Sequence, residues 1–512
     1  MIADLLNNIP GFVRVKYGFI LLGPVRTAFL GSVLLSIIAL PKGTINRDGM
    51  LYVETAHAFL EGGLQAALTV FPWPFLSVLM AWFSDMTGLG LETSGYLLNA
   101  LFMAGACALL VATSMRFHPE SSWYVSLVVL ALPGLNGYRD ELLREYGAWF
   151  FILLAFWLAL RWAERPSWPM ALAVQVALIV GALFRPEALA FFPALVLWQV
   201  FASPAEGRWR RVMQIGGLPL LGLTLLVALH VTGNLGSDRL ASDLSRMSLE
   251  RFDAKAQVMA QAFHHYARDQ APIILFFGSL AIIPLKFVVK MGVFILPLLY
   301  SANTEGVRGI FRNGQIFPWA FLAYLLVLAV FVLDLQFLSG RYLALLLVFS
   351  APWTGLGLWL LARRFPRTAL PVVALSLLIM LANVVSLQPG KTHFVEAGAW
   401  LAKNARDTER VYVESARAAY YAGWRFSARP IPEWRDQLEQ GLLQGKYDLV
   451  VIEVSNRDPS VDAWMVSAKV RQIARFEDSK GDAVIIARPL TGDDQDKALN
   501  TLSIRENTGS RE

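Results

Sequence analysis

The chain has 512 residues, of which 56% are hydrophobic and 16% are charged, and its formal net charge is +6. This composition excludes an ordinary soluble protein and indicates a chain that lies mostly in a membrane. The positive charge does not indicate nucleic-acid binding, because arginine and lysine concentrate in short loops between apolar runs, as orientation in a membrane requires. Cys107 is the single cysteine, so neither an intrachain disulfide nor a cysteine-based metal site is expected.

Apolar runs follow one another along residues 1–388. The first, from Gly18 to Leu40, is too long for the core of a signal peptide and ends without a small-residue cleavage site, so we interpret it as a retained helix. Later runs of similar character cover 148–160, 318–333, 342–361 and 370–387. A helix needs about 20 apolar residues to cross the hydrocarbon layer. The pattern predicts an α-helical polytopic membrane protein with about eleven spans.

The arginines of the short loops set the predicted orientation. With a cytoplasmic N-terminus, one count of spans places these arginines on the cytoplasmic side: Arg116, Arg161, Arg165, Arg208, Arg210, Arg211, Arg308, Arg312, Arg363, Arg364 and Arg367. The same count makes 41–95, 134–145 and 232–271 outer loops and places everything after residue 388 outside. We therefore predict a multi-pass protein of the cell inner membrane with an extracytoplasmic C-terminal domain.

Two apolar segments depart from the regular pattern. Phe75 to Met86 is short and follows a proline-rich stretch, so we predict a helix that lies at the membrane interface and does not cross it. The region from Pro272 to Tyr300 contains Pro284 and two lysines, and we predict a kinked or doubled segment there.

Residues 389–489 have the composition of a small soluble α/β domain, and 490–512 are predicted to be a disordered tail. The predicted elements are helices at 392–404 and 461–473 and strands at 410–413, 447–454 and 483–487. Tyr420, Tyr421 and Trp424 either offer aromatic faces to a sugar or acceptor or belong to the core of this domain.

Asp48 follows the first apolar run almost immediately, which places a carboxylate at the predicted outer membrane surface. An acid beside the bilayer is costly unless it is used. Asp48 either acts as a base for an acceptor hydroxyl or only caps the following helix, which carries Tyr52 one turn along.

The stretch Arg47–Tyr52 (RDGMLY) and the residues after it, up to Gly62-Gly63, resemble the first outer loop of the membrane glycosyltransferases of the GT-C fold, which include protein mannosyltransferases and aminoarabinose transferases. The segment 71–75 (FPWPF) is similar to the start of their juxtamembrane helix, and 340–342 (GRY) resembles their late Arg-Tyr motif. The resemblance implies a GT-C-like fold, an essential acid at Asp48, a polyprenyl-phosphate sugar donor and an inverting transfer.

The second outer loop precedes a span at the place where this family has a second acidic residue. Asp140 or Glu145 is predicted to be that acid, and Glu141 and Arg144 are predicted substrate contacts. Asp140 and Arg144 are also spaced as an ion pair one helical turn apart, which is the structural alternative.

Cations at predicted outer turns are candidates for the donor phosphate. Arg341, before Tyr342, is the first candidate, and Arg185 in an Arg-Pro-Glu turn is the second, because a guanidinium binds phosphate through two donors. Lys286 is a third candidate, and Tyr342 is a predicted substrate contact. The alternative for each cation is an anchor at the membrane interface.

No cofactor is certain from the sequence. Glu54, His57 and Glu61 share one predicted helical face, which either holds a divalent metal ion or is a solvated surface. There is no Walker loop, no Gly-x-Gly-x-x-Gly after a strand and no Gly-x-Ser-x-Gly, so neither nucleotide binding nor hydrolase-type nucleophilic chemistry is indicated.

These observations favour a glycosyltransferase that moves one sugar from a polyprenyl-phosphate donor to a lipid, glycan or protein acceptor on the outer face of the inner membrane. A flippase for the same lipid and a polysaccharide ligase or polymerase are the alternatives. Transporters place charges and broken helices near the midplane. The acids here gather at the predicted outer ends of helices, which favours the transferase.

Overall fold

The computed structural model describes residues 23–40, 44–202, 205–232, 249–312, 315–385, 391–405, 410–424, 426–427, 434–456, 458 and 460–490. The chain divides into two compact units. The first, Met1–Ala39 with Tyr96–Val385, is called the helical unit below. The second, Leu40–Gly95 with Ser386–Glu512, is called the mixed unit, and each is described by itself.

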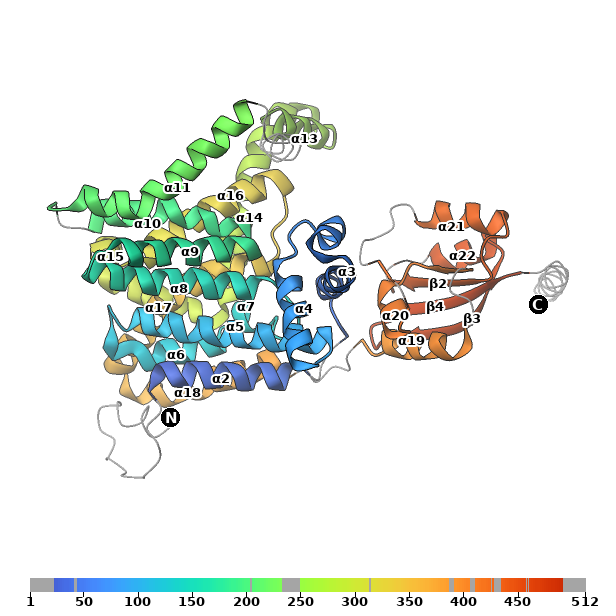
Figure 1. Ribbon diagram of the computed structural model, residues 1–512, viewed down its shortest axis with the longest axis horizontal. Coiled ribbons are helices and arrows are strands. Elements are labelled where there is room, and N and C mark those ends of the chain that lie inside the picture. Colours follow the sequence, from blue (N-terminus) through green and yellow to red (C-terminus); the bar gives the residue numbers. More distant parts are fainter. Residues whose placement is uncertain are drawn as a thin grey trace, which may run out of the picture. The chain divides into compact units, whose positions relative to one another are not determined.

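Helices of very different length make up the helical unit (Figure 1). In chain order they are α2 (Pro24–Ala39), α5 (Leu91–Ser114, most of which belongs here), α6 (Ser122–Ala131), α7 (Pro133–Asn136), α8 (Glu145–Glu164), α9 (Trp168–Phe184), α10 (Phe191–Ala202), α11 (Arg208–Val231), α13 (Leu249–Gln261), α14 (Ala271–Met291), α15 (Ile295–Arg312), α16 (Phe317–Leu335), α17 (Gly340–Arg364) and α18 (Ala369–Val384). Helices α8 and α9 pack side by side.

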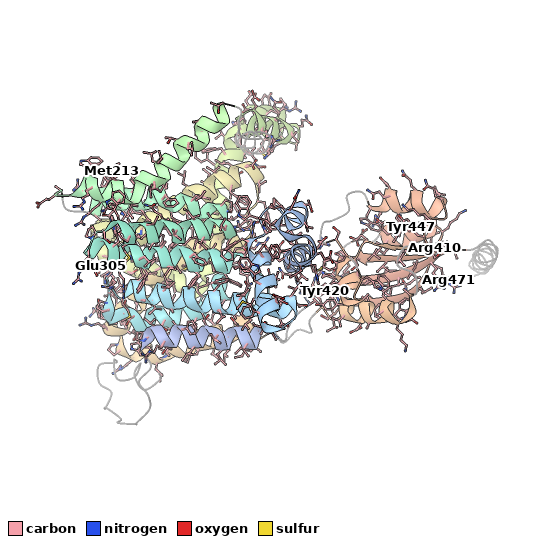
Figure 2. All side chains as sticks on the ribbon, viewed as in Figure 1. Met213, Glu305, Arg410, Tyr420, Tyr447 and Arg471 are labelled. Atoms are coloured by element: carbon pink, nitrogen blue, oxygen red, sulfur yellow. The ribbon has the colours of Figure 1, made fainter. Side chains whose placement is uncertain are left out.

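Five described helical segments are long and apolar enough to cross a bilayer, judged by length and composition: Leu91–Ser114, Glu145–Glu164, His265–Gly306, Phe317–Leu335 and Gly340–Arg364. Five further apolar helices are shorter. Leucines along several of these helices are exposed, and so is Met213 of α11 (Figure 2). Exposed apolar side chains suit a surface that faces lipid. The chain is therefore a mostly helical membrane protein, and the number of about eleven spans stays a prediction.

Helix α17 forms the centre of the helical unit. Its residues from Leu343 to Leu358 are buried without interruption, and it packs against α6, α15 and α16. Phe349 of α17 contacts the rings of Phe156 and Phe191, with centroids 5.7 Å and 5.4 Å away. This core fixes the first turn of α17 relative to the ends of its neighbours.

The region 272–300 is doubled, as predicted. Helix α14 ends at Met291, a short 3-10 turn η5 (Gly292–Phe294) follows, and α15 begins at Ile295. The break falls at Gly292, which has a φ of 54°, and not at Pro284, which lies inside α14.

The mixed unit contains a four-stranded sheet in the order β1-β2-β4-β3 (Figure 1). Its strands are β1 (Val411–Val413), β2 (Leu449–Val454), β3 (Val470–Glu477) and β4 (Ala483–Pro489). Strands β1 and β2 are parallel, and β4 pairs antiparallel with both β2 and β3. Alternate residues of β2 pack on opposite faces, Leu449 and Val451 on one and Val450 and Ile452 on the other.

Helices cover both faces of this sheet. Helices α19 (His393–Asn404) and α20 (Ala416–Tyr421) pack on one face, and α21 (Trp434–Leu443) and α22 (Ser460–Ser467) pack on the other. The unit also contains α3 (Arg47–Val70), which is broken at Gly62 and Gly63, and α4 (Phe75–Thr87).

Most predicted elements of the C-terminal region are present, with one error. The predicted helix 461–473 is too long, because α22 ends at Ser467 and Val470 already begins β3. The predicted short helix after Pro74 is confirmed as α4, while its location at a membrane interface stays a prediction.

Candidate functional site

A pocket opens in the helical unit where α8, the turn after α9, α16 and α17 meet. Charged and aromatic side chains share its wall with small and aliphatic ones: Glu145, Arg185, Glu187, Arg341, Trp149, Tyr324, Tyr342, Ala148, Ile152, Ala188 and Leu345. Four of these residues, Glu145, Arg185, Arg341 and Tyr342, are predicted site residues from sequence regions far apart, and the fold brings them together.

Arg185 is held between two carboxylates. Its Nη1 donates to Glu145 Oε1 at 2.8 Å, while Nη2 and Nε donate to the two carboxylate oxygens of Glu187 at 2.5 Å and 3.1 Å. The Arg185 and Glu145 side chains are only 12% and 6% exposed. Buried charges persist only when paired with good geometry, so this group is a fixed electrostatic feature of the pocket.

Arg341 approaches the same group from α17. Its Nε lies 3.7 Å from Glu145 Oε1, which is a longer contact than that of Arg185, and its side chain is 23% exposed. The other oxygen of this carboxylate, Glu145 Oε2, is buried and accepts no hydrogen bond within the described part of the chain. Buried polar atoms normally have partners. A ligand group that donates a hydrogen bond would satisfy this oxygen.

Aromatic rings complete the pocket wall. The guanidinium carbons of Arg185 and Arg341 lie 4.7 Å and 5.4 Å from the centre of the Tyr342 ring. The hydroxyl of Tyr324 donates to the backbone carbonyl of Tyr342 at 2.8 Å. Both arginines therefore contact an aromatic face that is anchored to α16.

Local sequence explains why these side chains lie at helix ends. Pro186 disfavours a helical conformation at Arg185, so α9 ends at Phe184 and a 3-10 turn η3 (Pro186–Ala190) follows. At the start of α17, a Cβ on Gly340 would lie 2.2 Å from the Tyr138 hydroxyl and 2.7 Å from Lys290 Cε. Only glycine permits this close approach immediately before Arg341.

The predicted second outer loop supplies Glu145 and not Asp140 to the pocket wall. Residues 137–144 form turns, and α8 begins at Glu145. The alternative of a helical ion pair between Asp140 and Arg144 is therefore wrong, because this stretch is not helical. Asp140, Glu141 and Arg144 are partly buried in the turns, and their predicted roles in substrate binding stay predictions.

Lys286 lies on α14 and is not among the residues that line the pocket. Its ammonium donates to the carbonyl of Leu338 and lies 5.5 Å from the centre of the Phe337 ring. In this position Lys286 stabilises the chain just before α17. Its predicted contact with the donor phosphate stays a prediction.

Asp48 and Tyr52 belong to the mixed unit. Asn46 is the N-cap of α3 and makes no side-chain capping bond, and Asp48 lies in the first helical turn. A carboxylate in that turn also interacts favourably with the helix dipole. The Tyr52 ring is buried, and its centroid lies 5.9 Å from the centroid of the Phe71 ring. The structure thus places Asp48 inside the first turn of α3, and not at the N-cap position that the alternative predicts.

The residues proposed for a metal ion do not converge. No group of three His, Cys, Asp or Glu side chains suited to a metal ion occurs in the described ranges. Glu54, His57 and Glu61 spread over about two turns of α3, roughly 10 Å along its axis. His57 and Glu61 are exposed, which fits a solvated helix face.

Among the charged and aromatic residues of the pocket wall, three were not predicted as site residues from the sequence: Trp149, Glu187 and Tyr324. Glu187 could have been identified from the sequence, because it lies two residues after Arg185 in the same break between apolar runs. Tyr324 and Trp149 lie inside uniform apolar runs, where nothing in the sequence distinguishes a pocket wall from a packed core.

No protein-family model and no curated protein sequence matches this chain. Its fold is similar to that of ArnT from Cupriavidus metallidurans bound to undecaprenyl phosphate, with a TM-score of 0.55, 13% identity and coverage of 90% of this chain and 97% of that chain. The apo form of ArnT gives a TM-score of 0.55 and 14% identity, with the same coverage.

The Archaeoglobus fulgidus oligosaccharyltransferase, crystallised with Zn and sulfate, is also similar, with a TM-score of 0.55 and 13% identity over 87% of this chain and 69% of that chain. The chain therefore has the fold of the GT-C membrane glycosyltransferases. This confirms the fold implied by the resemblance in the first loop.

Proposed function

We propose that this chain is a glycosyltransferase that moves a sugar from a polyprenyl-phosphate-linked donor to a lipid, glycan or protein acceptor at the outer face of the cell inner membrane. The observation that carries the proposal is the pocket in which Arg185 and Arg341 flank Glu145 at the ends of apolar helices. A protein of similar fold, ArnT, was crystallised with undecaprenyl phosphate, which supports a donor of this class.

Arg341 is the proposed ligand of the donor phosphate. Arg185 is already engaged by Glu145 and by both oxygens of Glu187. Arg341 is more exposed and lies farther from Glu145. A phosphate therefore binds to Arg341. Arg185 holds the neighbouring carboxylates in place and adds positive electrostatic potential.

Glu145 Oε2 and the aromatic rings are suited to the sugar. A sugar hydroxyl can donate to the buried oxygen that accepts no bond within the described chain. The partly exposed Tyr342, next to the buried Trp149, offers an aromatic face of the kind on which sugar rings pack. Glu145 is the acid of the second loop that the proposal places beside the donor.

Asp48 is the proposed base. It takes the proton of the acceptor hydroxyl as the acceptor oxygen forms a bond to the anomeric carbon on the face opposite the phosphate. The bond between that carbon and the phosphate oxygen breaks, and the polyprenyl phosphate leaves with the bonding electrons. Arg341 stabilises the charge that accumulates on the phosphate, so the step needs no added oxidant or reductant.

The test is sugar transfer from extracted polyprenyl-phosphate sugars to native envelope fractions by the purified protein. We expect Asp48→Asn to bind the donor but to transfer the sugar about 10²- to 10⁴-fold more slowly, the usual contribution of a general base. Asp85→Asn is the matched control, because Asp85 is an exposed acid on α4 in the same loop. This control should transfer at the wild-type rate.

Equal rates for Asp48→Asn and Asp85→Asn would remove Asp48 from the chemistry. If the wild-type protein transfers no sugar but moves the donor lipid across a vesicle bilayer, the flippase is the correct function. Extension of a polymer by many units would instead indicate a polymerase or ligase.

A further inference from the structure

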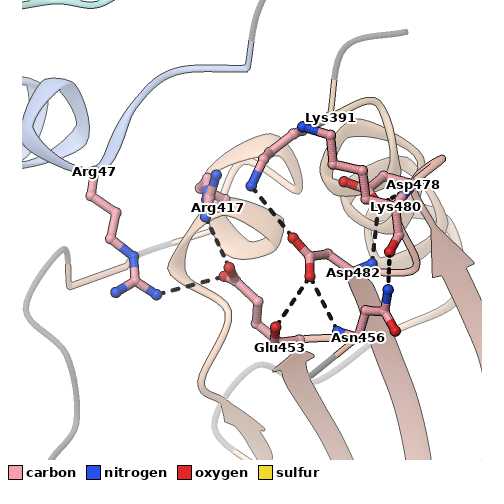
Figure 3. A network of polar contacts seen from close by, with 9 residues as sticks. Arg47, Lys391, Arg417, Glu453, Asn456, Asp478, Lys480 and Asp482 are labelled. Carbon is pink, nitrogen blue, oxygen red and sulfur yellow. Dashed lines mark hydrogen bonds and ion pairs between the residues drawn. The ribbon is translucent and has the colours of Figure 1, made fainter. Parts of the chain in front are cut away.

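The segment that carries Asp48 is bonded to the C-terminal α/β domain within the mixed unit. The backbone N–H of Ile45 donates to the Tyr421 hydroxyl at 2.8 Å. Arg47 Nη2 lies 3.8 Å from Glu453 Oε2 (Figure 3). These two contacts lie three residues and one residue before Asp48. Ile45 is fully buried, so its N–H depends on that hydroxyl.

The other end of the same segment is bonded to the neighbouring tyrosine. Tyr420, labelled in Figure 2, donates from its hydroxyl to Glu92 Oε2 in the first turn of α5. Residues 45 and 92 lie near the two ends of the predicted loop 41–95. Two adjacent tyrosines of α20 therefore bind both ends of the loop, and they use their polar ends for this contact.

The residues of the α/β domain that contact the loop are themselves held by bonds within the domain. Glu453 lies on β2, accepts from Arg417 Nη2 at 2.8 Å and donates its backbone N–H to Glu414 Oε2 at 2.8 Å. Arg417 also packs over the Phe394 ring at 3.8 Å. Helix α20 starts at the cap residue Ser415, and its next turn is buried against the sheet. A contact with such a surface restricts the loop.

We propose that the C-terminal domain is a positioning element for Asp48, with Tyr421 and Arg47 as the residues that set the start of α3. This inference rests on the proposed function, in which Asp48 is the base. The domain then needs no reacting group of its own. A displacement of about 1 Å at a reacting group can slow a reaction about 100-fold, so fixing the first turn of α3 is sufficient reason for the domain to contact it.

The test uses the full chain with Tyr421→Phe, which removes only the hydroxyl, and with Arg47→Gln. Hydrogen exchange of peptides covering residues 44–56 and sugar-transfer kinetics are measured on the same preparations. We expect faster exchange of these peptides and a kcat roughly 10-fold lower for Tyr421→Phe, with an unchanged KM for the donor. The effect of Arg47→Gln should be smaller, because this ion pair is long and Arg47 is 55% exposed. Arg47→Lys keeps the charge, so its hydrogen exchange and its kcat should both lie close to the wild-type values.

Two controls remove bonds inside the same domain that do not involve the loop. Tyr412→Phe removes a hydroxyl bond to the Trp434 carbonyl, and Arg410→Gln removes an exposed ion pair with Asp448. Both should leave the exchange of 44–56 and kcat unchanged.

Unchanged exchange of 44–56 in Tyr421→Phe would overturn the proposal, as would faster exchange with an unchanged kcat. A decrease in kcat in the controls as large as in Tyr421→Phe would also overturn it, because general destabilisation would then explain the result. Absence of transfer by the wild type would contradict the proposed function instead, and hydrogen exchange would still test the attachment of the loop.

Discussion

Each unit contains a carboxylate that meets two arginines, and the two arrangements differ in burial. In the helical unit, Glu145 faces Arg185 and Arg341 inside a pocket, and its side chain is 6% exposed. In the mixed unit, Glu453 faces Arg417 and Arg47, and its side chain is 22% exposed. The first group lines a pocket, whereas the second joins two segments of the chain.

This difference predicts how each group responds to the loss of a charge. Removal of one partner from a buried ion pair leaves an uncompensated charge and typically costs about 3–5 kcal/mol. The pair of Arg47 with Glu453, in which Arg47 is 55% exposed, should contribute only about 0–1 kcal/mol, because water screens it. Loss of Arg185 should therefore lower both stability and activity strongly, and loss of Arg47 should change mainly the placement of the loop.

The largest effect is expected for Arg185→Gln. This change leaves the buried Glu145 and the partly buried Glu187 without the cation that they share. We expect a loss of about 3–5 kcal/mol in the free energy of unfolding of the helical unit and little or no sugar transfer. Thermal unfolding in detergent and the transfer assay measure the two effects.

The matched control is Arg116→Gln, which breaks an exposed pair in the same unit. Arg116 Nη1 lies 2.6 Å from Glu164 Oε1, and the two side chains are 41% and 57% exposed. The control should lose less than about 1 kcal/mol. Equal losses for the two variants would show that burial does not distinguish these pairs and would contradict the comparison.

The next largest effect is expected for Arg341→Gln. Arg341 is partly exposed and makes a longer contact with Glu145, so the protein should fold nearly normally. Loss of a charge-assisted bond to the donor phosphate should raise the donor KM roughly 10- to 100-fold. Titration of the donor in the transfer assay measures this change.

Arg341→Lys tests whether charge alone is sufficient. Lysine keeps the charge but loses the planar pair of donors, so we expect an intermediate KM. A donor KM that stays at the wild-type value in both variants would remove Arg341 from the phosphate site.

The sequence could predict the pocket in part because its charges interrupt apolar runs. Glu145, Arg185 and Arg341 each lie at the edge of such a run, where an unused charge is unfavourable. The sequence could not decide between Asp140 and Glu145, because that choice depends on where α8 begins. Tyr324 was not predictable, since its role follows from the packing of α16 against the turn after α9.

The α/β domain shows a second limit of prediction from the sequence, which concerns the boundaries of elements. The boundary between α22 and β3 was missed because the turn contains no glycine or proline at the critical position. Lys469 adopts a φ of 52° there, a conformation that side chains other than glycine rarely take. The buried strands β2 and β4 were predictable from their continuous runs of aliphatic residues.

The smallest expected effect concerns pH and the mixed unit. His393 is buried at the start of α19, and neither ring nitrogen has a hydrogen-bond partner in the described part of the chain. Burial lowers the pKa of the imidazole, and the nearby charges of Lys391 and Arg417 also lower it, while Asp478 and Glu453 oppose them. The folded unit therefore binds a proton at His393 less readily than the unfolded chain does, where the imidazole has its ordinary pKa of about 6.5.

Because the unfolded state takes up more protons below that pH, acidification through the interval between the two pKa values should destabilise the mixed unit. We expect hydrogen-exchange protection of β2 and β4, corrected for the intrinsic pH dependence of exchange, to fall severalfold from about pH 7.5 to about pH 5.5. His393→Leu should remove most of this decrease, because leucine suits a buried site and does not titrate. His57→Gln, a change at an exposed histidine of α3, should retain it. If His393→Leu loses protection on acidification as steeply as the wild type does, the pH dependence has another source, and the buried imidazole does not weaken the domain that holds the loop of Asp48.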